Sequence, residues 1–97
     1  MGGVMAARKG VNIMKLNKEK FLKTEFGAEL ENCIKCWDEW LETKDRKAAD
    51  WCQAQWEVYK LALRQFYDVN YEFTRTDDYY GVVNEDDYSD WLFKVER

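Results

Sequence analysis

The apolar residues between Asn17 and Glu42 recur at steps of three and four, which is the spacing of one face of an α-helix. Asn17 is a suitable N-cap, because its side-chain oxygen can accept a hydrogen bond from a free backbone N–H. Gly27 costs about 1 kcal/mol relative to alanine in a helix interior, so the pattern allows a break or kink there. The apolar stripe consists of Leu22, Phe26, Leu30, Cys33, Trp37 and Trp40 or Leu41, widened by Phe21 and Ile34. The opposite face is charged and is expected to be solvated; it carries Lys20, Lys23, Glu31, Lys35, Asp38 and Glu42.

A second helical pattern follows the polar break Thr43-Lys44-Asp45 and extends from about Arg46 to Tyr67 or Asp68. Asp45 is placed to act as its N-cap. The main stripe consists of Ala48, Ala49, Cys52, Trp56, Tyr59, Leu63 and Phe66, and Trp51, Val58 and Ala62 broaden it towards another face. So broad an apolar surface predicts contacts on two sides of this helix. The stretch Cys33–Tyr67 is thus predicted to be the corner of a helical hairpin that holds most of the core.

The C-terminal part of the chain alternates with period two, the pattern of half-buried strands. In residues 69–75, the apolar positions on one side of the strand are Val69, Tyr71 and Phe73. In residues 90–96, one side carries Trp91, Phe93 and Val95, which alternate with Leu92, Lys94 and Glu96. With Tyr79–Val83 between them, these segments predict a three-stranded antiparallel meander. A short helix over residues 85–93, capped by Asn84, is the competing assignment, and the alternation favours the strand.

The predicted fold is therefore α+β, with two long antiparallel helices packed on a small three-stranded antiparallel β-sheet. A chain of 97 residues fits one domain, placed here at residues 15–97, and a single core of this size folds without disulfides or metals.

Residues 1–14 are predicted to form a basic, disordered N-terminal arm, because their apolar residues show no period and three glycines interrupt them. Helical patterning begins only after residues 15–17, so translation from Met14 is an alternative hypothesis, and both stay open. The N-terminus lacks the apolar segment of about 7 to 15 residues that marks a signal peptide, and no apolar run approaches the roughly 20 residues of a membrane helix. Three cysteines, an odd number, agree with a reducing compartment. The predicted localisation is cytoplasmic.

Charge is distributed unevenly along the chain. Residues 1–24 carry a net charge of +5, whereas residues 25–97 carry 18 acidic against 9 basic residues, a net charge of −9. An acidic body repels nucleic-acid and membrane phosphates and attracts basic surfaces, within a screening length of about 8 to 10 Å at physiological salt. Direct binding to nucleic acid or to a membrane is therefore not expected.

The patterns that could carry catalysis or bind metal are incomplete. Cys33-Ile34-Lys35-Cys36 is a C-x-x-C with Cys52 further along, but zinc takes about four ligands and the chain offers three cysteines and no histidine. The motif also lies within a helix, not at its start, where the thiol pKa would be lowered. The absence of histidine removes the commonest general base, and there is no glycine-rich phosphate loop. We predict buried structural cysteines, no metal site, no cofactor and no enzymatic activity.

The most concentrated polar feature is the acidic segment Asp77–Asp90, which holds six carboxylates and three tyrosines and no lysine or arginine. Tyrosine offers rigid contact area at binding hot spots, and an arginine from a partner can stack on its ring. The predicted partner-binding residues are Asp77, Asp78, Tyr79, Tyr80, Glu85, Asp86, Asp87, Tyr88 and Asp90. The alternative is that residues 76–78 and 84–89 are two solvated hairpin turns, since Asp and Asn favour turns.

A short single domain, an acidic segment with tyrosines and a lack of enzymatic motifs together resemble the small acidic inhibitors encoded by phages and other mobile elements, such as anti-CRISPR and antirestriction proteins. The resemblance is one of size and composition. It implies a DNA-mimicking protein that occludes a nucleic-acid-binding surface of a nuclease, such as the basic groove of a CRISPR effector. The alternative hypothesis is a structural or regulatory subunit that forms a homodimer through the aromatic face of its second helix, with Trp51 and Val58 in the interface.

Overall fold

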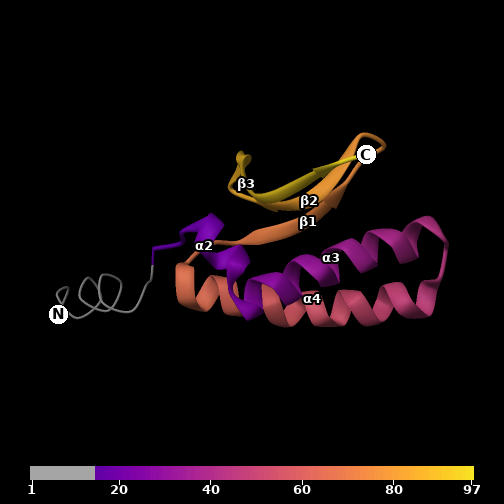
Figure 1. Ribbon diagram of the computed structural model, residues 1–97, viewed down its shortest axis with the longest axis horizontal. Coiled ribbons are helices and arrows are strands. Elements are labelled where there is room, and N and C mark those ends of the chain that lie inside the picture. Colours follow the sequence, from indigo (N-terminus) through magenta and orange to yellow (C-terminus); the bar gives the residue numbers. More distant parts are fainter. Residues whose placement is uncertain (1–14) are drawn as a thin grey trace, which may run out of the picture.

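The computed structural model describes residues 15–97, and the predicted N-terminal arm with its alternative start at Met14 lies outside them. The protein consists of a helical layer and a three-stranded antiparallel sheet of order β1-β2-β3 (Figure 1). The elements are α2 (Lys18–Lys23), α3 (Glu25–Glu42), α4 (Arg46–Tyr67), β1 (Tyr71–Arg75), β2 (Tyr79–Asn84) and β3 (Asp87–Glu96). The predicted α+β fold, with two long helices packed on a three-stranded sheet, is confirmed.

The core lies between the helices and the inner face of the sheet. Its buried side chains come from every layer: Phe21, Leu30, Ile34, Trp56, Leu63, Tyr71, Tyr80, Val82 and Leu92. At its margin the Trp37 ring of α3 stacks on the Phe73 ring of β1, with centroids 4.1 Å apart. Each large apolar side chain buried in this way contributes roughly 1.5–3 kcal/mol. Because α2, α3 and α4 lie on one side of the sheet, no helix among residues 15–97 covers its outer face (Figure 1).

The predicted single helix from Asn17 to Glu42 is wrong in one respect, because the chain breaks at Thr24 into α2 and α3. Asn17 caps α2 as predicted, accepting from Lys20 N. Thr24 leaves the helical conformation and caps α3 by accepting from Gly27 N at 3.0 Å. Gly27 lies just inside α3, where an added Cβ would fall 1.9 Å from the Phe21 carbonyl oxygen. Glycine at this position therefore allows the end of α2 to pack against α3.

The corner between α3 and α4 lies at the predicted polar break. Lys44 adopts a left-handed conformation with φ 62°, and Asp45 then caps α4 by accepting from Ala48 N at 3.2 Å. The helix ends at Asp68, which is also left-handed, with its N–H donating to the Arg64 carbonyl. The predicted bounds of the second helix are thus confirmed.

The pairing of β2 with β3 departs from regular alternation at two places, one on each side of Val83. Val82 pairs with Phe93 and Val83 pairs with Trp91, so Leu92 is an extra residue in β3 and forms a β-bulge. Leu92 is therefore buried in the core, although the period-two pattern placed it opposite Phe93. The alternative helix over residues 85–93 is wrong, since residues from Asp87 onward belong to β3.

Within residues 15–97, no helix is long and apolar enough to span a lipid bilayer.

Candidate binding surface on the outer face of the sheet

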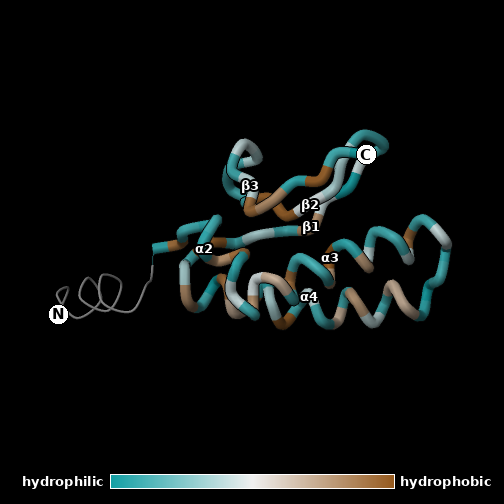
Figure 2. The backbone as a smooth tube through the Cα atoms, in the orientation of Figure 1, coloured by the Kyte–Doolittle hydropathy of each residue, from teal (hydrophilic) through white to brown (hydrophobic). Residues whose placement is uncertain are grey.

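Most of the acidic segment lies at the two turns at opposite ends of β2. Asp77 and Asp78 lie between β1 and β2, whereas Glu85 and Asp86 lie between β2 and β3, and Asp87 is the first residue of β3. At about 3.3 Å per residue, the length of β2 separates the two groups by roughly 20 Å. Both turns are hydrophilic and project from opposite ends of the sheet (Figure 2). The carboxylates thus form two exposed groups and not one patch.

Short polar side chains fix the shape of both turns. In the first turn the Thr76 hydroxyl accepts from the backbone N–H groups of Asp78 and Tyr79, each at 3.2 Å. In the second, Asn84 Oδ1 accepts from Asp86 N at 2.9 Å. Such hydrogen bonds from backbone N–H groups to Asn and Thr side chains are typical of solvated turns, which was the alternative interpretation of these residues. They leave the turn carboxylates exposed.

Asp87 is fixed by Ser89. Its Oδ1 accepts from the Ser89 hydroxyl at 2.6 Å and from the Ser89 backbone N–H at 3.0 Å. These two hydrogen bonds lower the pKa of Asp87, and its side chain therefore stays ionised to more acidic pH than a free aspartate.

Two of the predicted binding residues are engaged inside the protein. Tyr80 is only 9% exposed, belongs to the core and lies under the Arg97 guanidinium, 5.3 Å from its ring centroid, so it offers no surface to a partner. Asp90 pairs with Lys18 of α2 and accepts from Asn84 Nδ2 at 3.2 Å. The bond from Lys18 is the largest influence on Asp90 and lowers its pKa.

The outer face of the sheet brings Tyr79 and Tyr88 together with residues that the sequence did not single out. The Tyr79 and Trp91 rings meet edge to face, with centroids 5.4 Å apart. A hollow of about 220 Å³ lies beside them, lined by Glu72, Thr74, Tyr79, Val83, Tyr88 and Trp91. Glu72 could have been found from the period-two pattern, which places it on the side of its strand away from Tyr71 and Phe73. The same pattern placed Trp91 on one side with Phe93 and Val95, and the bulge at Leu92 puts it on the opposite side.

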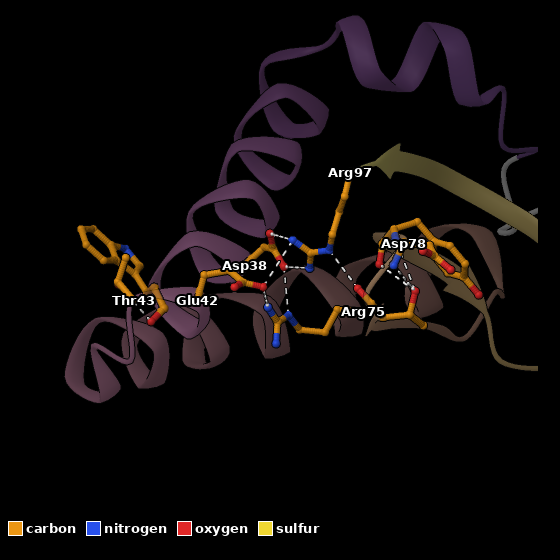
Figure 3. Close-up of polar contacts among 9 residues, drawn as sticks. Asp38, Glu42, Thr43, Arg75, Asp78 and Arg97 are labelled. Carbon is orange, nitrogen blue, oxygen red and sulfur yellow. Dashed lines mark hydrogen bonds and ion pairs between the residues drawn. The ribbon is translucent and has the colours of Figure 1, made fainter.

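A second charged cluster lies on the inner side, at the end of the sheet next to α3 (Figure 3). Asp38, expected to be solvated, is only 6% exposed. Its carboxylate accepts from Arg75 Nε at 2.9 Å and from Arg97 Nη1 and Nη2 at 3.0 and 2.5 Å. Glu42 accepts from Arg75 Nη2 at 2.6 Å. The prediction for Asp38 is wrong because Arg75 of β1 and Arg97, which follows β3, cover it.

The pKa of Asp38 reflects two opposing effects. Burial is the largest single influence and raises the pKa, but the hydrogen bonds and charges of Arg97 and Arg75 together outweigh it and lower the pKa. Asp38 is therefore ionised in the folded protein at neutral pH and ties the ends of β1 and β3 to α3.

The three cysteines are free, and two of them are buried. Cys33 Sγ donates to the Cys52 carbonyl at 3.5 Å. Burial is the main cause that raises the pKa of Cys33 to about 11, so its thiol is protonated at neutral pH. These contacts agree with structural cysteines. In the described part of the chain, no three Cys, Asp or Glu side chains are grouped so as to hold a metal ion.

The outer face of the helical layer is apolar at several positions. Trp51 and Val58 of α4 are 65% and 66% exposed, and Leu61 and Phe66 of the same helix are also exposed. A groove of about 490 Å³ between α3 and α4 is lined on this side by Cys36, Trp51 and Tyr59, among others. The expected second contact surface of α4 thus has no covering element among residues 15–97.

The chain was also compared with known proteins. No protein-family model matches it, and neither a curated protein nor a solved structure does.

Proposed function

We propose that this protein is a non-enzymatic, acidic inhibitor that acts in the cytoplasm by occluding a basic nucleic-acid-binding surface of a nuclease, such as a CRISPR effector. The observation that carries the proposal is the charge of the sheet's outer face and its turns. Seven carboxylates there make no ion pair with any residue in the described range 15–97: Glu72, Asp77, Asp78, Glu85, Asp86, Asp87 and Glu96.

The other charges of the sheet are largely engaged within the fold. Arg75 and Arg97 pair with Asp38 and Glu42, and Lys94 is the remaining basic residue of the three strands. Unpaired exposed carboxylates attract a basic partner within about 8 to 10 Å of the surface at physiological salt. They therefore favour association with a positively charged groove.

The spacing of the two acidic turns suits an extended groove. Successive phosphates of one DNA strand are spaced by about 3.4 Å along the helix axis. Two acidic groups roughly 20 Å apart therefore span the length of about six nucleotides, measured along that axis. The aromatic side chains between them would fill the middle of such a groove.

The test is DNA cleavage by a panel of purified CRISPR effector complexes and restriction endonucleases, with the protein added in excess. We expect inhibition of at least one nuclease, weaker at high salt and reduced about tenfold, roughly 1.4 kcal/mol, by the double change Asp86→Asn and Asp87→Asn. Inhibition that survives neutralisation of the whole acidic segment would exclude this mechanism, and a panel left fully active would count against nuclease inhibition altogether.

The exposed apolar residues of α4 support a second candidate, a structural or regulatory subunit that self-associates through this helix. Trp51 and Val58 are seven residues apart and so lie on one helix face. Sedimentation equilibrium separates the two candidate functions. If the protein is a self-associating subunit, we expect a dimer that Trp51→Glu dissociates. A strict monomer at high micromolar concentration would contradict self-association.

A further inference from the structure

The hollow on the outer face of the sheet is large enough for a side chain. Its volume of about 220 Å³ is roughly seven times the ~30 Å³ that one water molecule occupies in the liquid. Val83, which is almost completely buried, forms its floor, and Tyr88, which is 66% exposed, borders it. Glu72 and Thr74 of β1 line the side away from Trp91.

The rings beside this hollow already attract a cation. The Lys94 ammonium lies 4.3 Å from the centroid of Tyr79 and 5.1 Å from that of Trp91. Both distances are within the roughly 6 Å at which a positive charge is drawn to the negative face of an aromatic ring. Lys94 does not line the hollow itself, so its ammonium leaves the space between Tyr79 and Glu72 to another group.

Glu72 adds a negative charge to the aromatic surroundings. It is half-buried and has no ion-pair partner among residues 15–97. The Tyr88 side chain lines the same hollow, and its interaction with Glu72 is the main cause that raises the pKa of Tyr88. A carboxylate has two oxygens with about four lone-pair sites, so Glu72 can accept two parallel hydrogen bonds from an incoming donor.

We propose that the hollow bounded by Glu72, Tyr79, Tyr88 and Trp91 binds the guanidinium group of an arginine side chain from a protein partner. A guanidinium is planar, stacks on aromatic faces and donates two parallel hydrogen bonds to a carboxylate, whereas a lysine ammonium is a compact, strongly hydrated charge. The inference deepens the proposed function, because a nucleic-acid groove presents arginines, and it names the group that the centre of the acidic surface recognises.

The experiment is an NMR titration of the full chain with the blocked tripeptide Gly-Arg-Gly, followed at the Trp91 indole and the Val83 amide. The matched peptides carry lysine or citrulline, the latter a neutral analogue of arginine. We expect saturable shifts with arginine, at least threefold weaker binding with lysine and none with citrulline. Equal shifts with arginine and citrulline would overturn the proposal.

Variants of the protein test whether the arginine peptide binds in the hollow. Glu72→Gln should weaken arginine binding at least fivefold, and Lys94→Gln should strengthen it by removing a like charge. The Asp86 carboxylate lies outside the hollow, so Asp86→Asn should leave the affinity for the arginine peptide within twofold of wild type. If Asp86→Asn weakened binding as much as Glu72→Gln, the hollow would not be the site. Tyr88→Leu, at an exposed position, repeats the test should Glu72→Gln unfold. No nuclease enters this titration, so a failure here is separate from a failure of the inhibition assay.

Discussion

The carboxylates of α3 and those of the sheet turns are the same chemical group in opposite surroundings. Asp38 is almost completely buried and accepts hydrogen bonds from two arginines (Figure 3). Asp77 and Asp86 are exposed and have no ion-pair partner among the described residues. Paired, buried charge holds a fold in one arrangement, whereas unpaired, exposed charge is available to a partner. The comparison therefore separates acidic residues that support the scaffold from acidic residues that act on its surface.

The largest effect is expected from Asp38→Asn. Removing one member of a buried charge cluster costs about 3–5 kcal/mol, and since the arginine side chains are partly exposed we expect about 2–3 kcal/mol here. Urea denaturation measures the free energy of unfolding. Glu39→Gln, an exposed neighbour on the same helix, should change stability by less than about 0.5 kcal/mol. Equal losses of unfolding free energy in the two variants would show that the buried Asp38 stabilises the fold no more than an exposed carboxylate does.

Arg97→Ala should cost less than Asp38→Asn, about 1–2 kcal/mol, because Arg75 continues to pair with Asp38. The side chain of Arg97 also donates from Nε to the Thr76 carbonyl at 2.8 Å, so its loss loosens the first turn. Hydrogen exchange should therefore accelerate at Tyr79, whose N–H lies in that turn, and remain unchanged in the turn at Asp86. Uniform acceleration in both turns would indicate a general loss of stability instead.

Acid pH should reduce the difference between wild type and Asp38→Asn. The pKa of Asp38 is lowered in the folded state, so its contribution is present above the ordinary aspartate value of 3.8 and is lost as the pH falls through its folded pKa. Unfolding free energies measured between pH 6 and pH 2.5 should converge for the two proteins at the acid end. A constant difference over this range would show that the charge of Asp38 is not what stabilises the fold.

The smallest effect on stability is expected in the turns. Changing Asp77, Asp78, Asp86 and Asp87 together to Asn should alter the free energy of unfolding by less than about 1 kcal/mol, since the side chains are exposed and Asn can still accept the turn hydrogen bonds. Thermal unfolding checks this. A loss comparable to that of Asp38→Asn would assign the turn acids to the scaffold.

Sequence patterns predicted the elements better than they predicted which charges are buried. The caps at Asn17 and Asp45 correctly gave the starts of α2 and α4, because these signals are local, although the helical spacing did not reveal the break at Thr24. The burial of Asp38 depends on arginines 37 and 59 residues away in the chain, and no local pattern contains that information.

The candidate surface was predicted only in part, because local patterns do not show which residues of different strands lie together. Composition marked the acidic turns, but the position of Glu72 and Tyr88 in one hollow and the outward position of Trp91 depend on strand register. The bulge at Leu92 shifts that register by one residue, and period-two reasoning assumes that no such shift occurs.

The most direct test of the account compares two variants of equal net charge in the nuclease inhibition assay. One carries the four turn changes, and the other carries Glu29→Gln, Glu39→Gln, Asp50→Asn and Glu57→Gln at exposed positions of α3 and α4. If the sheet surface binds the nuclease, the turn variant should inhibit at least about tenfold more weakly, and the helix variant should remain within about twofold of wild type. Equal losses in both variants would show that net charge, and not this surface, determines the inhibition.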